Sequence, residues 1–294
     1  MRAERRRKIH LALRQWYRRN QRPLPWRRTR DPYRILISEV MLQQTQVARV
    51  EPKYQAWLRT FPSVRALAGA RLSTILRRWS GLGYNQRARR LRQIARVIVQ
   101  HYGGRFPRAV KEWEQLPGIG PYTARAVSAF AFRQRQVVME TNVRRVVGRI
   151  VFGRHAPPSP SSLGQATADL VPPRNSDRWH HALMDLGAMV CTSQRPRCQV
   201  CPIRSYCRAY PSILRSPTGP TQSGPGPQRF DGSDRFWRGR IVASLLVQGF
   251  TFRQLQKKLR LRGRLSGHRL GELIVGLRRD GLVVYQDGKL GIAP

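Results

Sequence analysis

The chain has 294 residues, enough to bury a substantial core and, by length alone, to form about two domains. It carries 56 Lys and Arg residues against 15 Asp and Glu residues, a formal net charge of +41, and this excess predicts a polyanionic partner. The sequence contains neither an 18-residue apolar run nor a segment that pairs a basic face with a continuous apolar one, so a membrane partner is not expected.

The region from about residue 8 to residue 153 predicts a series of amphipathic helices. Apolar residues recur there at i, i+3 and i+4 spacing, with almost no alternating strand pattern. Glycines and prolines that favour turns separate the helical runs at residues 23–25, 61–63, 81–83, 103–104 and 117–120. We therefore expect an all-α body.

An acidic residue, Glu39, stands inside the largely apolar stretch 35–42. Burying a carboxyl is costly unless it is paired or protonated, so desolvation is expected to raise the pKa of Glu39. A carboxyl that stays partly neutral near pH 7 can act as a general acid. The alternative is a Glu of the core or of an amphipathic face that a nearby Arg neutralises.

The run LPGIGPYTA at residues 116–124 predicts a tight hairpin that opens a helix. The glycines allow a sharp turn, Pro121 suits the first helical turn, and the exposed amides of Gly118, Ile119 and Gly120 can bind phosphate. This is the helix-hairpin-helix signature, which holds a DNA strand without reading its sequence. The alternative is a plain connector between two helices.

A second acid, Glu140, follows the apolar residues 137–139, and Thr141 or Asn142 after it can cap a helix. Near a helix N-terminus Glu140 would stay ionised. Two carboxyls in unlike surroundings suit cleavage of a glycosidic bond through a cationic transition state. The alternative is that Glu140 is only an acid of the capping region.

The four cysteines of the chain, Cys191, Cys198, Cys201 and Cys207, form one compact loop. Disulfides are disfavoured, because the chain begins without an apolar signal stretch and is large enough not to need them. Zinc modules usually supply two separated C-x2-C pairs, whereas this loop has one pair flanked by single cysteines. The spacing therefore favours an iron–sulfur cluster over zinc.

Arginines lie between these cysteines, at Arg195, Arg197 and Arg204. Guanidinium groups around a rigid loop would form a surface that contacts DNA phosphates. The alternative is a loop that only supports folding, and the two roles are compatible.

The C-terminal part predicts a separate basic module. Residues 211–228 are mostly Ser, Pro, Gly, Thr and Gln, as in a flexible linker. Three helical runs follow at 235–246, 252–261 and 266–280, and residues 281–292 place apolar runs around an Asp-Gly turn, which indicates a hairpin. This is the pattern of a winged helix; a helical appendage without a DNA role is the alternative.

Together these motifs resemble the MutY-type adenine DNA glycosylases of the helix-hairpin-helix superfamily that includes endonuclease III. The resemblance spans about residues 16–210. It rests on LPWR at 24–27, SEVMLQQTQV at 38–47, GLGY at 81–84, LPGIGPYTA at 116–124, ETNVRRV at 140–146, ALMDLGAMVC at 182–191 and the four-cysteine loop.

The resemblance implies an all-α, two-domain helix-hairpin-helix glycosylase fold. A six-helix barrel would occupy residues 25–135, and residues 1–24 and 136–210 would form the domain that carries a [4Fe-4S] cluster. We expect a linker at 211–229 and the winged-helix-like domain at 230–294.

Roles carry over from the family to matching residues. Glu39 matches the acid that protonates the adenine, and Glu140 stands where the family has an Asp that stabilises the cationic sugar. An error of about 1 Å in placing such a group can cost on the order of a hundredfold in rate. Tyr122 replaces the Schiff-base Lys of the lyases, which implies a monofunctional enzyme. The candidate residues for base flipping and the base pocket are Gln43, Tyr84, Tyr122 and Asn142.

The expected substrate is double-stranded DNA with a mismatched or oxidised base pair, most simply adenine opposite G or 8-oxoguanine. The C-terminal part is too short for the family's Nudix-like domain, which checks for 8-oxoguanine. Stretches such as HYGGRFPR are similar to those of thymine/uracil mismatch glycosylases, so U or T opposite G is the first alternative substrate. A damage-binding protein weakened by the change at residue 140 is the second. We further expect a monomer in a bacterial or archaeal cytoplasm, associated with the nucleoid.

Overall fold

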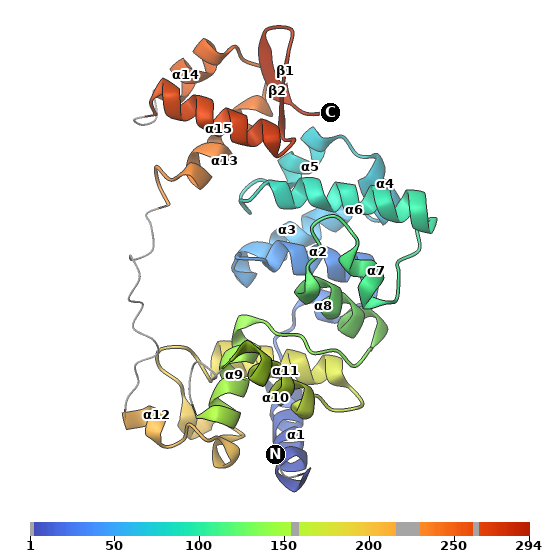
Figure 1. Ribbon diagram of the computed structural model, residues 1–294, viewed down its shortest axis with the longest axis vertical. Coiled ribbons are helices and arrows are strands. Elements are labelled where there is room, and N and C mark those ends of the chain that lie inside the picture. Colours follow the sequence, from blue (N-terminus) through green and yellow to red (C-terminus); the bar gives the residue numbers. More distant parts are fainter. Residues whose placement is uncertain (1–2, 154–158, 216–229, 261–264) are drawn as a thin grey trace. The chain divides into compact units, whose positions relative to one another are not determined.

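The computed structural model describes residues 3–153, 159–215, 230–260 and 265–294, which are mostly helical (Figure 1). The chain divides into two compact units. The first unit contains Met1–Ile35, Arg108–Glu114 and Ile119–Gly224, and the second contains Leu36–Pro107, Gln115–Gly118 and Pro225–Pro294. None of the helices in the described ranges is long and apolar enough to cross a membrane.

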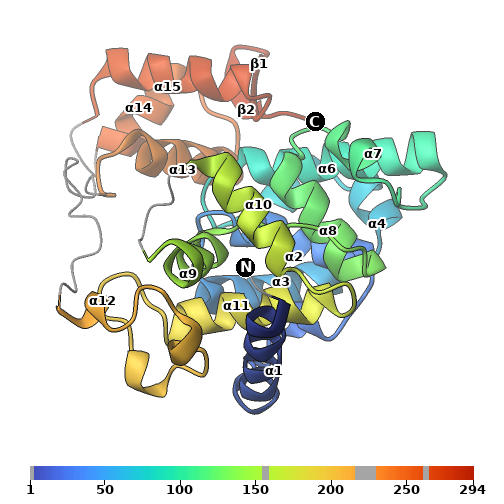
Figure 2. The ribbon, with the colours of Figure 1, turned by 60° about the horizontal axis from the view of Figure 1, so that its bottom comes forward.

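The first unit is a helical bundle with a cysteine loop. Its helices are α1 (Ala3–Asn20), α7 (Val110–Glu114), α8 (Pro121–Phe132), α9 (Thr141–Phe152), α10 (Pro160–Leu170), α11 (Ser176–Met189) and α12 (Ser212–Arg215). The 3-10 turns are η1 (Pro25–Arg27), η2 (Cys198–Val200) and η3 (Arg204–Tyr206). Figure 2 shows α9 beside α11.

An apolar cluster joins α1, α9, α10 and α11 of this bundle. Leu13 of α1, Val147 of α9 and Leu183 of α11 are fully buried in it. Close packing of α9 on α11 depends on Gly187, because a Cβ there would come within 2.5 Å of the Asn142 side chain. The close approach therefore fixes the position of the N-terminal turn of α9.

The second unit combines a helical body with the C-terminal module. The body consists of α2 (Pro32–Leu42), whose first turn belongs to the first unit, and of α3 (Val47–Thr60), α4 (Val64–Gly69), α5 (Leu72–Trp79) and α6 (Gln86–Tyr102). Trp57 and Trp79 are fully buried and meet edge to face, with ring centroids 5.5 Å apart. Such aromatic pairs add roughly 1 kcal/mol beyond the area that they bury.

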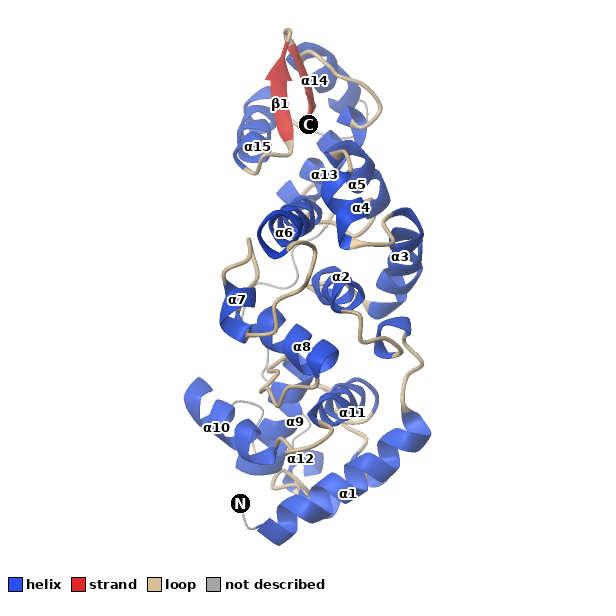
Figure 3. Ribbon diagram, turned by 90° about the vertical axis from the view of Figure 1, so that its right-hand side faces the viewer, coloured by secondary structure: helices blue, strands red, loops and turns tan. Residues whose placement is uncertain are grey.

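The C-terminal module has the winged-helix pattern that the sequence predicts. Helices α13 (Asp234–Leu245), α14 (Phe252–Arg260) and α15 (Gly267–Arg279) precede strands β1 (Val283–Gln286) and β2 (Lys289–Ile292). The strands are antiparallel around Asp287 and Gly288, both of positive φ, as a two-residue hairpin turn requires. Phe250 forms an antiparallel bridge with Leu290 of β2, so a third short segment of chain pairs with the hairpin. Figure 3 shows this hairpin in red, and within the described residues it contains the only strands.

The predicted linker and domain limits are only partly visible. Residues 212–215 at the start of the predicted linker form α12, and residues 216–229 lie outside the described residues, as does position 261 at the end of one predicted helix. The domain limits derived from the sequence stay a prediction.

A buried arginine, Arg87, connects three segments of the second unit. Its Nη1 donates to the carbonyls of Val40, Met41 and Gln43, at 2.6 to 3.1 Å. Its Nη2 donates to Thr45 Oγ1 and to the carbonyls of Leu82 and Gly83, at 3.0 to 3.1 Å. The cation thus satisfies the last carbonyls of α2 and complements the negative end of its dipole. Burial lowers the pKa of Arg87 to about 10, which leaves the group charged at neutral pH.

Replacing this cation should destabilise the second unit. Arg87→Met removes every donor and leaves several buried carbonyls unsatisfied, so we expect a loss of roughly 3 kcal/mol or more of unfolding free energy, measured by urea denaturation. Arg87→Lys should recover part of the loss, because a lysine has three donors and no planar fork. The control is Arg96→Met on the same helix, where the exposed side chain contacts one carbonyl. Equal losses in both Met variants would contradict the connecting role.

Candidate functional site

Glu39 lies in the last turns of α2, within the second unit. Its side chain is 7% exposed, and the helix buries Leu36, Val40 and Met41 around it. The structure therefore places this acid in the largely apolar setting that the sequence predicts.

Gln43 and Tyr84 line one cavity of about 360 Å³ in the second unit. Arg87 holds both segments, because it donates hydrogen bonds to the carbonyl of Gln43 and to the carbonyl of Gly83, just before Tyr84. Tyr84 has φ 48° and a side chain that is 42% exposed. An exposed ring on a turn that Arg87 holds in place can insert between stacked bases.

The hairpin 116–120 connects α7 with α8 and has the geometry of the predicted phosphate grip. Gly118 has φ +75°, and a Cβ there would come within 2.6 Å of Arg90 Cδ, so the position favours glycine. Gly120 is the N-cap of α8 and Pro121 its first residue, with Tyr122 next in the first turn. These bounds leave the first amides of α8 without helical partners, as at any helix start.

Glu140 lies in the first unit and is the N-cap of α9. Its Oε1 accepts a hydrogen bond from the backbone N–H of Val143 at 2.9 Å, and its Oε2 accepts one from Asn142 Nδ2 at 3.1 Å. Thr141 and Asn142, which the sequence suggested as caps, lie inside the first turn of α9 instead, and Glu140 itself has the capping role. This role does not compete with a catalytic one, because the same contacts fix the direction of the carboxylate.

A buried histidine anchors the segment before Glu140. His180 Nε2 accepts a hydrogen bond from the N–H of Val138 at 3.1 Å, and His180 Nδ1 lies 2.8 Å from the carbonyl of Ser176. This arrangement requires the neutral ring with the proton on Nδ1. Burial agrees with it, because it lowers the pKa of His180 to about 4.

Asn142 and Arg145 connect Glu140 to the cysteine loop. Arg145 Nη2 donates to Asn142 Oδ1 at 2.6 Å and to the carbonyl of Gly187 at 2.7 Å. Arg145 Nε donates to the carbonyl of Cys191 at 2.8 Å. Asn142 thus orients the Glu140 carboxylate, and Arg145 continues the hydrogen-bond network to the first cysteine.

Arg149 organises the start of the cysteine loop. It is 1% exposed, and its Nη1 contacts Cys191 Sγ at 3.1 Å and donates to the carbonyl of Thr192 at 2.7 Å. Its Nη2 donates to the carbonyl of Ser193 at 2.8 Å. These contacts place a buried cation beside the first cysteine and tie the next two residues to α9.

Four free cysteines in one loop supply the four thiolates that an iron–sulfur cluster needs. Cys201 lies close enough to the other three to interact with each electrostatically. Burial, and secondarily these neighbours, raise the pKa of Cys201 to about 12, so binding of a metal group would release its proton. Across the described ranges no three His, Cys, Asp or Glu side chains are grouped to hold one metal ion.

The arginines between the cysteines are positioned at the surface. Arg195, Arg197 and Arg204 are all exposed, and Arg204 contacts the carbonyl of Gln199 at 3.1 Å. Exposed guanidinium groups on a loop that Arg149 fixes from inside remain available to an anion.

Sequence reasoning missed one fully buried acid, Asp185. Its carboxylate accepts two hydrogen bonds from the fork of Arg27, at 2.6 and 2.9 Å, and one from Arg22 Nε at 2.5 Å. Arg27 belongs to the LPWR motif and Asp185 to the ALMDLGAMVC motif, so the two motifs meet in the first unit. The apolar residues around Asp185 were the signal, the same one that identified Glu39.

Loss of Arg149 should destabilise the cysteine loop. Arg149→Met leaves the carbonyls of Thr192 and Ser193 without this donor, at roughly 1 to 3 kcal/mol each. We expect a lower iron and sulfide content per chain and a lower melting temperature. Arg195→Met, on the exposed side of the same loop, is the control and should change neither. Unchanged iron content in Arg149→Met would contradict the supporting role.

Comparisons with known proteins agree with this geometry. The family model described as HhH-GPD superfamily base excision DNA repair protein matches residues 37–173, and that of the iron-sulfur binding domain of endonuclease III matches residues 191–207. The chain is 45% identical to an adenine DNA glycosylase of Mycolicibacterium smegmatis, over 79% of this chain and 78% of that protein. It is 42% identical to the adenine DNA glycosylase of Homo sapiens, over 67% of this chain and 38% of that protein.

Among solved structures, a thermostable thymine-DNA glycosylase matches with a TM-score of 0.66 and 31% identity, over 70% of this chain and 97% of that chain. An endonuclease III–DNA complex matches with a TM-score of 0.61 at 24% identity, which supports the fold alone. The chain thus belongs to the adenine DNA glycosylase family, within the HhH-GPD superfamily of base excision DNA repair proteins.

Proposed function

We propose that the protein hydrolyses the N-glycosidic bond of adenine in double-stranded DNA, with the adenine opposite G or 8-oxoguanine. The observation that carries the proposal is the contrast between two carboxyls. Glu39 is only 7% exposed, within an apolar stretch of α2, whereas Glu140 is partly exposed and caps a helix N-terminus with its carboxylate. Environments that differ in this way assign different protonation roles to two acids.

Glu39 acts as the general acid. A carboxyl among apolar side chains is easier to keep protonated than one in water, because burial disfavours the charged form. It donates its proton to a ring nitrogen of the adenine, which makes the base a better leaving group. Positioned proton transfer of this kind contributes about 10² to 10⁴ in rate.

Glu140 stabilises the positive charge that develops on the sugar as the bond breaks. The hydrogen bonds from Val143 N–H and Asn142 hold the carboxylate in one direction before the reaction starts. Preorganised charge of this kind needs no rearrangement in the transition state.

The enzyme is a monofunctional glycosylase. Tyr122, in the first turn of α8, stands where the endonuclease III-like lyases have their Schiff-base lysine, and a phenol cannot form an imine. The product is an abasic site in an intact strand. Gln43 and Tyr84 assist flipping of the base, and the amides of Gly118, Ile119 and Gly120 with Arg195, Arg197 and Arg204 contact the phosphates.

The protein carries a [4Fe-4S] cluster, and Cys191, Cys198, Cys201 and Cys207 are its ligands in our proposal. The matching iron–sulfur family model begins and ends at the two outer cysteines. The bound group fixes the loop between α11 and α12, which presents the arginines. We expect the protein to act as a monomer, in a bacterial or archaeal cytoplasm.

Uracil or thymine opposite G remains the second candidate substrate. The observation in its favour is the likeness to a thymine-DNA glycosylase at 31% identity. A damage-binding protein with weakened catalysis is the third candidate, because Glu140 replaces the Asp of the family.

A panel of duplexes tests the substrate. The protein is incubated with A:8-oxoguanine, A:G, U:G and T:G duplexes, followed by alkali to cut abasic sites. We expect scission of the two adenine-containing pairs and a loss of about 10² to 10⁴ in Glu39→Gln, which keeps the shape without the acid. Glu51→Gln on α3 is the control. Scission of U:G or T:G alone would establish the second candidate.

The substitution Glu140→Asp distinguishes an active glycosylase from a damage-binding protein with weakened catalysis. In Glu140→Asp the carboxylate retreats by about 1 Å from the position set by Val143 and Asn142, so we expect base release to slow by on the order of tenfold to a hundredfold in single turnover. Glu112→Asp, another acid that accepts a backbone N–H at a helix start, is the matched control. A faster reaction in Glu140→Asp would support the weakened damage-binding protein.

A further inference from the structure

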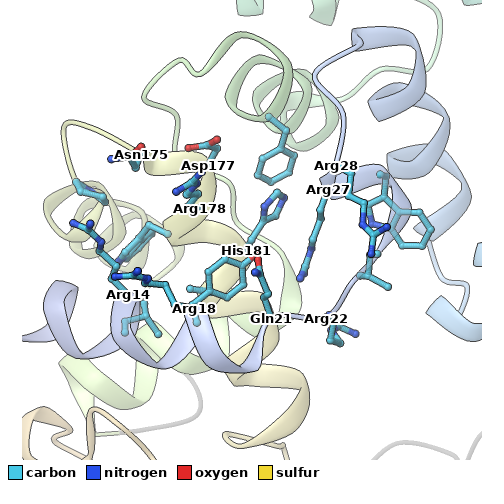
Figure 4. A pocket seen from close by; sticks show the side chains of 18 of the residues that line it. Arg14, Arg18, Gln21, Arg22, Arg27, Arg28, Asn175, Asp177, Arg178 and His181 are labelled. Carbon is cyan, nitrogen blue, oxygen red and sulfur yellow. The ribbon is translucent and has the colours of Figure 1, made fainter.

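A large cavity in the first unit stands apart from the candidate catalytic residues. It has a volume of about 840 Å³ and lies between the C-terminal half of α1, residues 21–30 and the start of α11 (Figure 4). Neither Glu140 nor Tyr122 is among the described residues that line it. Its size is that of a small-molecule site rather than a gap for a few waters.

Arginines dominate the lining of this cavity. Three of them are engaged by carboxylates: Arg22 and Arg27 by Asp185, and Arg30 by Asp177 at 3.8 Å. Five more line the cavity, Arg14, Arg18, Arg28, Arg174 and Arg178. All fifteen acids of the chain lie in the described ranges, and within those ranges none forms an ion pair with these five.

The five arginines come from three separate elements. Arg14 and Arg18 are one turn apart on α1, Arg28 follows η1, and Arg174 and Arg178 flank the start of α11. Figure 4 shows Arg14, Arg18 and Arg178 near one another and Arg28 on the opposite side of the cavity. All five side chains are exposed, so they form a rim. Like charges gathered in this way repel one another until an anion lies between them.

The floor of the cavity is aromatic and contributes no further cation. Tyr17 and Trp179 are buried there, and Phe130 stacks on His181 with ring centroids 4.5 Å apart. Burial, and secondarily Arg27, lower the pKa of His181 well below its ordinary value, so the ring is neutral. The positive charge of the site is therefore that of guanidinium groups, which cannot lose their protons.

We propose that this cavity binds an oligophosphate through Arg14, Arg18, Arg28, Arg174 and Arg178. Guanidinium forks match phosphate oxygens in pairs, and five of them around a cavity of this volume exceed what one phosphate can engage. The start of α11 adds amides and the positive end of a helix dipole. The same chemistry is supplied by the tail of a free nucleotide or by consecutive phosphates of a DNA strand.

Calorimetric titration of the full, cluster-bearing protein with inorganic triphosphate tests the site. The variant Arg14→Gln/Arg18→Gln removes two rim charges from α1. Its matched control, Arg7→Gln/Arg19→Gln, removes two exposed charges from the same helix that do not line the cavity. We expect one triphosphate per chain in the wild type and the control, and binding at least tenfold weaker in the rim variant. Arg178→Gln, on α11, should also weaken the binding of triphosphate.

Binding of an undamaged duplex to the same proteins distinguishes the two sources. A rim variant that loses triphosphate but binds duplex like its control indicates a free nucleotide or oligophosphate. A rim variant that also binds duplex tenfold more weakly than its control indicates the DNA backbone. Equal triphosphate binding by the rim variant and the control, or weak binding without a defined stoichiometry, would overturn the proposal. None of these outcomes depends on base release, so failure of the proposed enzymatic function would leave them readable.

Discussion

Buried arginines that bind main-chain carbonyls are the interaction on which the rest of this structure depends. With 56 basic and 15 acidic residues, the chain has far too few carboxylates to give each cation a partner of its own. Arg87 instead contacts five carbonyls and one hydroxyl, and Arg149 contacts the carbonyls of Thr192 and Ser193. A planar group with five donors suits this task better than an ammonium does. Main-chain carbonyls therefore take the place of carboxylates as the partners of these buried arginines.

These same arginines hold the candidate site segments. Arg87 fixes the end of the helix that carries Glu39 and the turn that carries Tyr84, all within the second unit. Arg145 and Arg149 fix the N-terminal turn of α9 and the cysteine loop, all within the first. Carboxylates are thereby left for other contacts: Glu140 caps α9, and Asp185 pairs with Arg22 and Arg27.

Local patterns in the sequence predicted the parts of the fold that depend on neighbours along the chain. The Asp287-Gly288 turn, the glycine of positive φ at residue 118 and the compact cysteine loop each follow from a few adjacent residues. Arg145 and Arg149 escaped detection because their partners lie about forty residues away and are carbonyls, which no residue type signals. For Glu140 the sequence left a capping and a catalytic interpretation open, and the structure makes the two compatible.

The high positive charge creates an electrostatic difficulty for the proposed chemistry. A net charge of +41 draws the protein to DNA, but the same field opposes a sugar that becomes cationic as its base departs. Distance resolves the conflict, since charges beyond about 10 Å are largely screened at physiological salt. A carboxylate held at a fixed position, as Glu140 is by Val143 and Asn142, acts at short range where screening is weak. In the proposed mechanism, the surface charge therefore governs association with DNA, and the few fixed acids govern the reaction.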